Sequence, residues 1–407
     1  MKIKSLKSQI TIIMIVGLVM FIVAGLVLYI SKTTIKKSSQ QAAKKTQDTA
    51  TKTEPINDLV NQCLDKLAKD AVTLIGKQGG YIYKNQGGTL VSFSDSDEGE
   101  FYIEDGSFKV AYNIIKSSLH LPQPYSFIVP DYPWKNFPAK PNMPCNTKNS
   151  DTEFHGIFGF SVMPPLNSSE GPHSIQTQIE TFIENNLGTC LDFKLFKDEG
   201  YEITMSKNKT KVIIGTDDIS LRSEIPLKVM NTFTKETLEM RDFSTNLNIR
   251  FKDFYYFVKQ FINNDIGDVT FNMKDPKNYK NLFSVRIADN AYHYDDLITV
   301  RDEKSLINGK PLEYTFAREN RYPAIYCIEN PVLEFPEGEQ ITQEKLLQGS
   351  ELKAEDPDED TIKFSVKALL PNPDLPVNLD QPFIQFKVSA SDGDLEDFEI
   401  ITVNRKG

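Results

Sequence analysis

This chain is organised around the stretch ITIIMIVGLVMFIVAGLVLYI, residues 10–30, which contains no charged residue. A bilayer core needs about 20 consecutive apolar residues in a helix, and no later segment of the sequence supplies such a run. The run is longer than the apolar part of a cleaved secretory signal, and no A-x-A-type cleavage site follows it. We therefore expect a retained, single-pass transmembrane helix that leaves the rest of the chain on one side of the membrane.

The charges that flank this run do not settle its orientation. Three lysines precede the run and five follow it before residue 46: Lys2, Lys4 and Lys7, then Lys32, Lys36, Lys37, Lys44 and Lys45. By the positive-inside rule this is nearly balanced and slightly favours the wrong side for an external body. We still expect the bulk of the chain to be extracytoplasmic at the cell membrane, because the cysteine count and the final domain fit that location.

Composition limits the functional classes. At 407 residues the chain is too long for one ordinary core, so two or three domains are expected. The net charge of −10 argues against nucleic acid as a partner. The sequence contains no G-x-S-x-G, H-E-x-x-H or P-loop motif. We therefore predict a protein that is not an enzyme.

The predicted fold class is α+β, with four segments. Residues 1–31 are the tail and transmembrane helix, and residues 32–53 form a polar tether rich in Lys, Thr, Gln, Ser and Ala. Residues 54–326 form an α+β body with a mainly antiparallel sheet, because helical crossovers are missing. Residues 327–407 form an all-β sandwich.

Periodic apolar residues predict three helices in the body. The first starts at Glu54 and ends at Gly79-Gly80, the second covers residues 170–187, and the third covers residues 251–262. Alternating patterns predict strands, with Gly87-Gly88 as a turn between two of them. The predicted strand segments are 81–86, 89–93, 101–105, 201–206, 209–216, 220–231, 247–251, 283–289, 297–302 and 311–319. The proline-rich segment between Leu121 and Cys145 is expected to be an extended loop.

The four cysteines stand apart, without the C-x-x-C spacing of a zinc site. Outside the cytoplasm an even count favours two disulfides, for which three pairings are open; the alternative is four buried free thiols. Cys63 lies on the apolar face of the first predicted helix, and Cys190 follows the second. If these helices pack together, Cys63 pairs with Cys190, which leaves Cys145 with Cys327.

The amino-terminal part of the chain resembles a family of uncharacterised membrane-anchored proteins of small-genome archaea. The resemblance rests on the lysine-flanked apolar start, the helix that ends in GKQGGYIY (residues 76–83), and the second helix with its trailing Cys190. It covers roughly residues 1–260 and implies a membrane location rather than an activity.

Two motifs mark the final segment. An L-x-A-x-D-x-D run holds Leu352, Ala354, Asp356 and Asp358, and a V-x-A-x-D-G run holds Val388, Ala390, Asp392 and Gly393; a strand is expected after each. This pattern resembles a cadherin-like repeat, a β-sandwich of cell surfaces. The resemblance implies Ca²⁺ at the junction with the preceding domain, because Ca²⁺ takes six to eight oxygen ligands. The expected ligands are Glu329, Asn330, Asp356, Asp358 and Asp392.

The final segment also departs from that family. Only Glu329-Asn330 stands where true cadherins carry an Asp-Asn-Asp-Asn linker. The alternative for the aspartates is structural turn chemistry without a metal, since aspartate side chains accept hydrogen bonds from nearby backbone amides. In the segment NAYHYDDL, His293 with Asp295 and Asp296 invites a metal or acid–base interpretation, but a turn is the simpler one.

The sequence thus favours a single-pass surface protein that acts in binding or adhesion. Its partner is a surface protein or glycan, and calcium stiffens the junction of the final domain. The first alternative is a structural pilin-like or envelope subunit, which the residues Lys7-Ser8-Gln9 before the apolar run suggest. The second alternative is an ectoenzyme.

Overall fold

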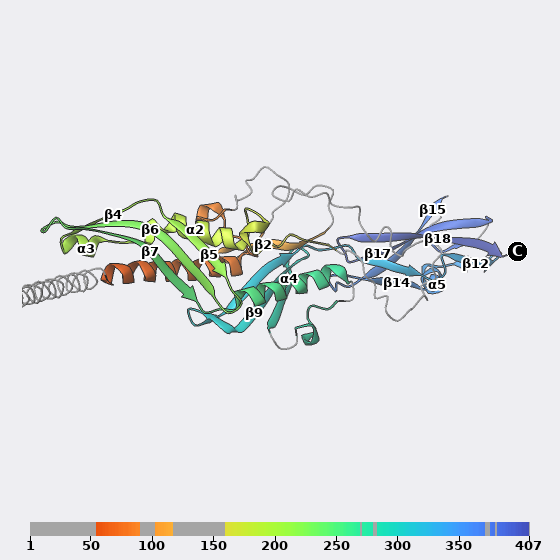
Figure 1. Ribbon diagram of the computed structural model, residues 1–407. Helices are drawn as coiled ribbons and strands as arrows, with labels where there is room; N and C mark the ends of the chain where they lie inside the picture. The colour runs from red at the N-terminus through yellow and green to blue at the C-terminus, as the bar shows by residue number, and fades with distance from the viewer. Residues whose placement is uncertain are drawn as a thin grey trace, which may run out of the picture. The chain divides into compact units, whose positions relative to one another are not determined.

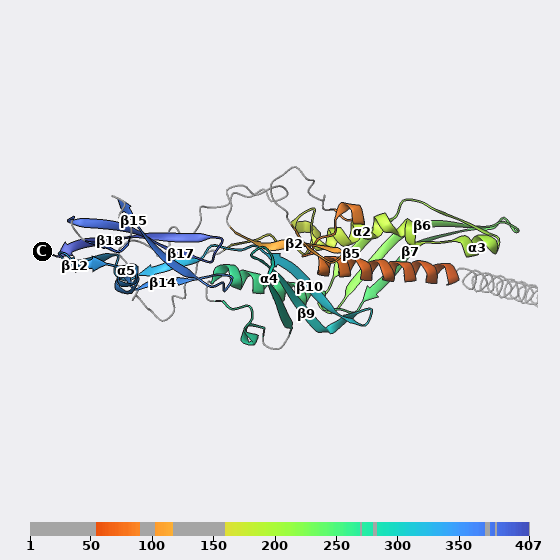
Figure 2. The same ribbon diagram turned by 180° about the vertical axis from the view of Figure 1, so that it is seen from behind.

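The computed structural model describes residues 54–89, 102–116, 159–268, 271–279, 283–370, 375–378 and 381–406 (Figures 1 and 2). The chain forms two compact units, residues 1–62 and 63–407. The apolar run 10–30, the tether and the proline-rich segment lie outside the described residues. Within the described residues, no helix is long and apolar enough to span a bilayer. The architecture is α+β with mostly strands in several sheets, as the sequence predicts.

The first helix covers residues 54–77, as its periodicity predicts. From Leu64 onwards its apolar face is fully buried, with Leu64, Ala68 and Ile75 at 0% exposure. Gly79 and Gly80 end the helix with φ angles of +65° and +91°. No side chain fits there, because a Cβ on Gly79 would lie 2.7 Å from the carbonyl oxygen of Ala111.

The main sheet of the body follows the order β1-β2-β10-β9-β8, and β3 pairs with β2. All its pairings are antiparallel except β10 with β2. Helix α4 (Phe251–Gly267) packs on β2, β3 and β9 with the apolar face that the sequence predicts. The strands are β1 (Tyr102–Asp105), β2 (Phe108–Ile115), β3 (Phe160–Ser161), β8 (Ser284–Tyr292), β9 (Asp295–Ile307) and β10 (Lys310–Arg318).

The second sheet of the body is built on the long strand β6 (Ile219–Asn231). Strand β7 (Thr237–Leu247) pairs with one edge of β6, while β4 (Tyr201–Met205) and β5 (Lys209–Ile214) pair in succession along the other. Helix α2 (Ile175–Cys190) packs on β5, and the short α3 (Lys194–Asp198) packs on β4. The alternating burial along β6 leaves one face of this sheet open.

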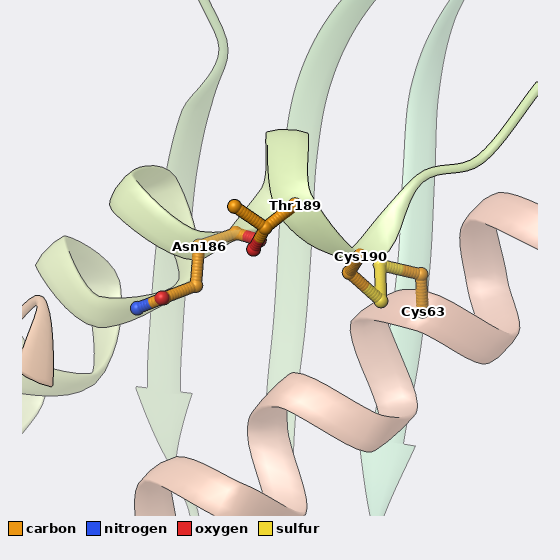
Figure 3. The surroundings of a disulfide bond; sticks show 4 residues. All are labelled: Cys63, Asn186, Thr189 and Cys190. Carbon is orange, nitrogen blue, oxygen red and sulfur yellow. A yellow bond between two sulfur atoms is a disulfide. The ribbon is translucent and has the colours of Figure 1, made fainter.

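A disulfide joins Cys63 in the first helix to Cys190 at the end of α2 (Figure 3). This is the pairing that helix packing suggested. Beside it, Thr189 donates a hydrogen bond to the carbonyl oxygen of Asn186 at 2.7 Å, which holds the last turn of α2. Cys145 lies outside the described residues, as does the side chain of Cys327.

The final segment has a four-stranded sheet in the order β12-β18-β17-β15 and two ladders, β11-β14 and β13-β16. Its core contains Ile341, Leu346, Val366, Phe386, Val388 and Val403. The prediction of an all-β segment is wrong in one element, because helix α5 (Gln343–Ser350) begins at a Thr342 cap and buries Leu346. The strands are β11 (Ala324–Ile328), β12 (Val332–Pro336), β13 (Gln340–Ile341), β14 (Leu352–Glu355), β15 (Lys363–Leu370), β16 (Val377–Asn378), β17 (Phe383–Ser391) and β18 (Glu396–Lys406).

Three local predictions differ from the structure. The segment before Gly87-Gly88 contains the 3₁₀ turn η1 (Lys84–Gln86) instead of a strand, because the side-chain oxygen of Gln86 accepts the amide of Tyr83 at 3.1 Å. Segment 247–251 is split between the end of β7 and the start of α4. The second helix begins at Ile175, after Pro172 and the Ser174 cap. Two further 3₁₀ turns are η3 (Ser168–Glu170) and η4 (Pro276–Asn278).

Removing the disulfide should destabilise the body strongly. The bond closes a loop with a sequence separation of 127 residues, and a loop of this length stabilises a fold by about 5 kcal/mol through the unfolded chain. We expect Cys63→Ser to lower the free energy of unfolding by about that amount, measured by denaturant titration without reductant. The double variant Cys63→Ser/Cys190→Ser should match the single one; a much larger loss in the double variant would show that the two thiols contribute separately.

Candidate functional site: the ionic joint before the final domain

The segment that links the body to the final domain is held by a buried cluster of charged side chains. We call Arg318, Arg321, Asp265, Asp296 and Asp358 the joint cluster. Arg318 ends β10, Asp265 lies on α4, Asp296 lies on β9, and Asp358 lies in the loop between β14 and β15. All five side chains are at most 7% exposed.

Arg318 bridges three carboxylates. Its Nη2 lies 2.6 Å from Asp296, its Nη1 lies 3.1 Å from Asp265, and its Nε lies 3.1 Å from Asp358. Nη2 also lies 3.3 Å from the carbonyl oxygen of Asp358. One guanidinium therefore ties a helix and a strand of the body to a loop of the final domain.

Arg321, which lies in the linker, donates hydrogen bonds to the same loop between β14 and β15. Its Nε and Nη2 donate to Asp358 Oδ1 at 2.9 and 2.7 Å, while its backbone amide donates to Asp358 Oδ2 at 2.7 Å. Nη2 also donates to the carbonyl oxygen of Pro357 at 2.7 Å and lies 2.9 Å from Asp265 Oδ2. Both oxygens of Asp358 are thus occupied by one arginine.

Burial and ion pairing have opposite effects on the pKa values of the cluster. Burial would raise the pKa of Asp358, but Arg321 and Arg318 outweigh it and hold this pKa below its usual value. For Asp265 burial outweighs the same two arginines, so its pKa is raised. Burial would lower the pKa of Arg318, but Asp358, Asp265 and Asp296 raise it. Both arginines therefore stay charged in the folded protein.

Asp356 lies beside the cluster with an incomplete set of partners. Its Oδ1 accepts the amides of Asp358 at 2.8 Å and Asp360 at 3.2 Å, which shapes the loop. Its Oδ2 is buried without a hydrogen-bond partner among the described residues. Burial, followed by the charge of Asp358, raises the pKa of Asp356 to about 7. Burial and the same charge raise the pKa of Asp360 to about 6.

Asp392 reaches the linker from the turn between β17 and β18. Its Oδ1 accepts the amides of Asp394 at 2.7 Å and Leu395 at 2.6 Å. Its Oδ2 accepts a hydrogen bond from the side chain of Asn320 at 3.2 Å. The V-x-A-x-D-G motif therefore closes its turn, as aspartates before turns do, and also fastens the linker.

Glu329 and Asn330 lie at the other end of the short β11-β14 ladder. In this ladder Ile328 faces Leu352, whereas Ala324 faces Glu355, next to Asp356. Three residue steps along a strand separate these ends by about 10 Å. Glu329 pairs with Lys353 at 2.8 Å, and the side chain of Asn330 donates to the carbonyl oxygen of Gly349 at 3.0 Å.

The five residues expected to bind calcium therefore do not fit one ion. Asp356, Asp358 and Asp392 gather around the linker, but Glu329 and Asn330 do not join them. The oxygens of Asp358 face two guanidiniums, which already supply positive charge at this point. Within the described ranges, no three side chains of His, Cys, Asp or Glu form a group that could hold a metal.

The segment around His293 forms a hairpin turn, the simpler of its two interpretations. His293 has a φ of +53° between β8 and β9, and Tyr292 faces Asp295 across the turn. The two aspartates work separately: Asp296 joins Arg318, whereas Asp295 accepts the hydroxyl of Tyr112 and, at 2.7 Å, the amide of Asn320. Both carboxylates that the metal or acid–base interpretation required therefore already accept hydrogen bonds elsewhere.

Sequence reasoning missed Arg318, Arg321, Asp265 and Asn320. The two arginines stand in the segment ARENRY, directly before the predicted start of the final domain at residue 327. Two arginines at a domain boundary, ahead of a domain that carries a D-x-D motif, are the signal that was present. The partner Asp265, more than 50 residues earlier, gave none.

No protein-family model matches the chain, and no curated protein matches it either. Among solved structures, Drosophila N-cadherin EC1-4 is similar at 10% identity over 51% of this chain and 67% of that one, with a TM-score of 0.16. The endo-fucoidan hydrolase MfFcnA4 of glycoside hydrolase family 107 is similar at 7% identity over 50% of this chain and 38% of that one, with a TM-score of 0.13. At such scores neither likeness carries an argument about this chain.

Breaking the joint cluster should cost far more than breaking an exposed ion pair. Arg321→Met leaves Asp358 and Asp265 buried with less compensation, which typically costs about 3–5 kcal/mol. We expect a loss of that size in denaturant unfolding. The matched control is Arg405→Met, because its partner Glu337 is 76% exposed and such pairs contribute about 1 kcal/mol or less.

A separate experiment compares the unfolding temperature in millimolar calcium with that in excess chelator. We expect equal values for the native chain, since the guanidiniums supply the positive charge at the joint. A rise of several degrees in calcium would contradict this and support the calcium site that the sequence predicts.

Asp356 should make the protein less stable as pH rises. Its folded-state pKa of about 7 lies above the usual 3.8, so between these values the folded state binds a proton that the unfolded chain has lost. Stability from this group is therefore lost as pH rises through 7. We expect Asp356→Asn to raise the free energy of unfolding at pH 8 by roughly 2–4 kcal/mol relative to its effect at pH 5. Equal effects at both pH values would refute the assignment.

Proposed function

We propose that the chain is a single-pass membrane protein whose disulfide-bonded body and final domain lie outside the cytoplasm and bind a partner at the cell surface. Residues 10–30 supply the anchor, because they form the one run long enough to cross a bilayer. The partner is a surface protein or a glycan.

The observation that carries this proposal is the disulfide between Cys63 and Cys190. Disulfides form and persist in oxidising compartments and are rare in the cytosol. The bond lies 33 residues beyond the end of the apolar run. It therefore favours an outside body, where the flanking lysines left the orientation open.

The joint cluster holds the final domain in a fixed arrangement on the linker, and this supports a binding role. Asp358 accepts three hydrogen bonds from Arg321, and Asp392 accepts one from Asn320. Two loops of the final domain are therefore hydrogen-bonded to one linker. A further contact joins Asp397 to the amide of Ile325 at 2.9 Å. Buried, hydrogen-bonded charges specify geometry, which suits a module that presents its surfaces to a partner without calcium.

Protease accessibility on intact cells tests the location. We expect added protease to degrade the body of the full-length protein, while an epitope tag before Met1 stays protected until the cells are lysed. Protection of the body until lysis would overturn the proposal. Sequencing the mature amino terminus separates the pilin-like alternative, for which cleavage next to Gln9 is expected.

A further inference from the structure

Two Asn-x-Ser/Thr sequons lie in the body, away from the joint cluster. They are Asn167-Ser168-Ser169 and Asn208-Lys209-Thr210. This tripeptide is the acceptor of N-linked glycans in proteins that leave the cytoplasm. The proposed function places the body outside the cytoplasm, so both sequons meet the first condition for modification. The second condition is structural and concerns the surroundings of the asparagine amide and of the hydroxyl two residues later.

The first sequon lies on a surface turn. Asn167 precedes η3 in an extended conformation, with φ −100° and ψ 147°, and its side chain does not cap the turn. All three residues of η3 are exposed, and one of them is Ser169, which supplies the hydroxyl of the sequon. The turn is closed by backbone groups alone, since the amide of Glu170 donates to the carbonyl oxygen of Asn167 at 3.0 Å. The turn therefore needs neither side chain that a glycosyltransferase would engage.

This turn is fixed from its buried side by the start of α2. Leu166 is 1% exposed, and its carbonyl oxygen accepts the amide of Gln176 at 3.1 Å. The side-chain oxygen of Gln176 in turn accepts the amide of Ser168 at 3.1 Å. The backbone on both sides of Asn167 is thus bonded to one helix, and the exposed part of the turn is left to carry a substituent without disturbing the core.

The side-chain amide of Asn167 has one contact, which a glycan does not remove. Its Nδ2 donates to Oε1 of Glu170 at 2.5 Å, and this contact is exposed. A primary amide carries two N–H groups, and glycan transfer replaces only one of them. The remaining N–H is still a donor for Glu170, so the folded body accommodates the linkage without loss of a buried hydrogen bond.

The second sequon is engaged by the fold at both of its functional groups. Nδ2 of Asn208 donates to the carbonyl oxygen of Glu184 in α2 at 3.2 Å. Thr210 is 4% exposed, and its hydroxyl lies 2.9 Å from Oγ of Ser223 in the neighbouring strand β6. Its amide also donates to Oε1 of Glu184 at 2.7 Å. An enzyme that must reach the amide and the hydroxyl together finds both within contacts between helix and sheet.

We propose that the folded body is N-glycosylated at Asn167 and not at Asn208. The donor is an oligosaccharide linked through phosphate to a lipid, brought by a membrane-bound transferase. Nδ2 of Asn167 forms a bond to the anomeric carbon of the sugar, while the bond between that carbon and the phosphate oxygen breaks. The amide proton passes to a base of the transferase, and the lipid phosphate is the leaving group. The inference rests on the proposed location of the body outside the cytoplasm.

Mass spectrometry of the full-length protein, purified from the cells that naturally produce it, tests the inference. We expect the peptide with Asn167 to carry the added mass of a glycan, and the peptide with Asn208 to have its sequence mass. Asn167→Gln should remove the added mass. Ser169→Ala should remove it as well, although Asn167 is retained, whereas Ser169→Thr should keep it, because either hydroxyl completes the sequon. Asn208→Gln is the matched control and should leave the added mass unchanged.

Three results would overturn the inference: an unmodified Asn167, added mass that survives Ser169→Ala, or equal occupancy of Asn208. The Ser169 variants should unfold at the temperature of an equally glycosylated or unglycosylated native chain, since the residue is exposed, and this shows that they are folded. Protease accessibility on cells is a separate measurement. An unmodified Asn167 on an accessible body refutes only the modification, whereas a protected body refutes the proposed location.

Discussion

The buried contact between Arg321 and Asp358 is the constraint on which the linker and the final domain depend. It brings a side chain, a backbone amide and a loop into one hydrogen-bonded unit, and Arg318 extends this unit to α4 and β9. Removing charges from water is costly, so such a cluster adds little net stability over apolar packing. Its value is geometric, because misplacing any member leaves the others buried and unpaired.

The disulfide and the Gly79-Gly80 pair fix the first helix against the rest of the body. Cys190 ties the end of α2 to the first helix, and Gly79 and Gly80 let that helix end against the main sheet, where the amide of Gly79 donates to the carbonyl oxygen of Thr315 at 2.8 Å. Strand β10, which contains Thr315, ends at Arg318. One strand therefore connects the region anchored by the helix to the region anchored by the joint cluster, so the two constraints act on a common element.

Local patterns predicted what depends on local chemistry. The helix of residues 54–77, α4 and most strands follow from apolar periodicity, and Asp356 and Asp392 close their loops as turn residues do. The joint cluster could not be predicted, because Asp265, Arg318 and Asp358 are distant in sequence and meet only in the folded chain. The D-x-D motif suggested calcium because the sequence does not show that two arginines occupy the carboxylate of Asp358. Segment 81–88 was misassigned because Gln78 and Gln86, rather than a neighbouring strand, satisfy its backbone.

The joint shows what burial does to an unbalanced charge. At the joint, three carboxylates face two guanidiniums out of water, and burial, followed by the negative charge of Asp358, raises the pKa values of the neighbouring Asp356 and Asp360. A buried excess of negative charge must be neutralised by the protein itself, through protonation of a carboxylate.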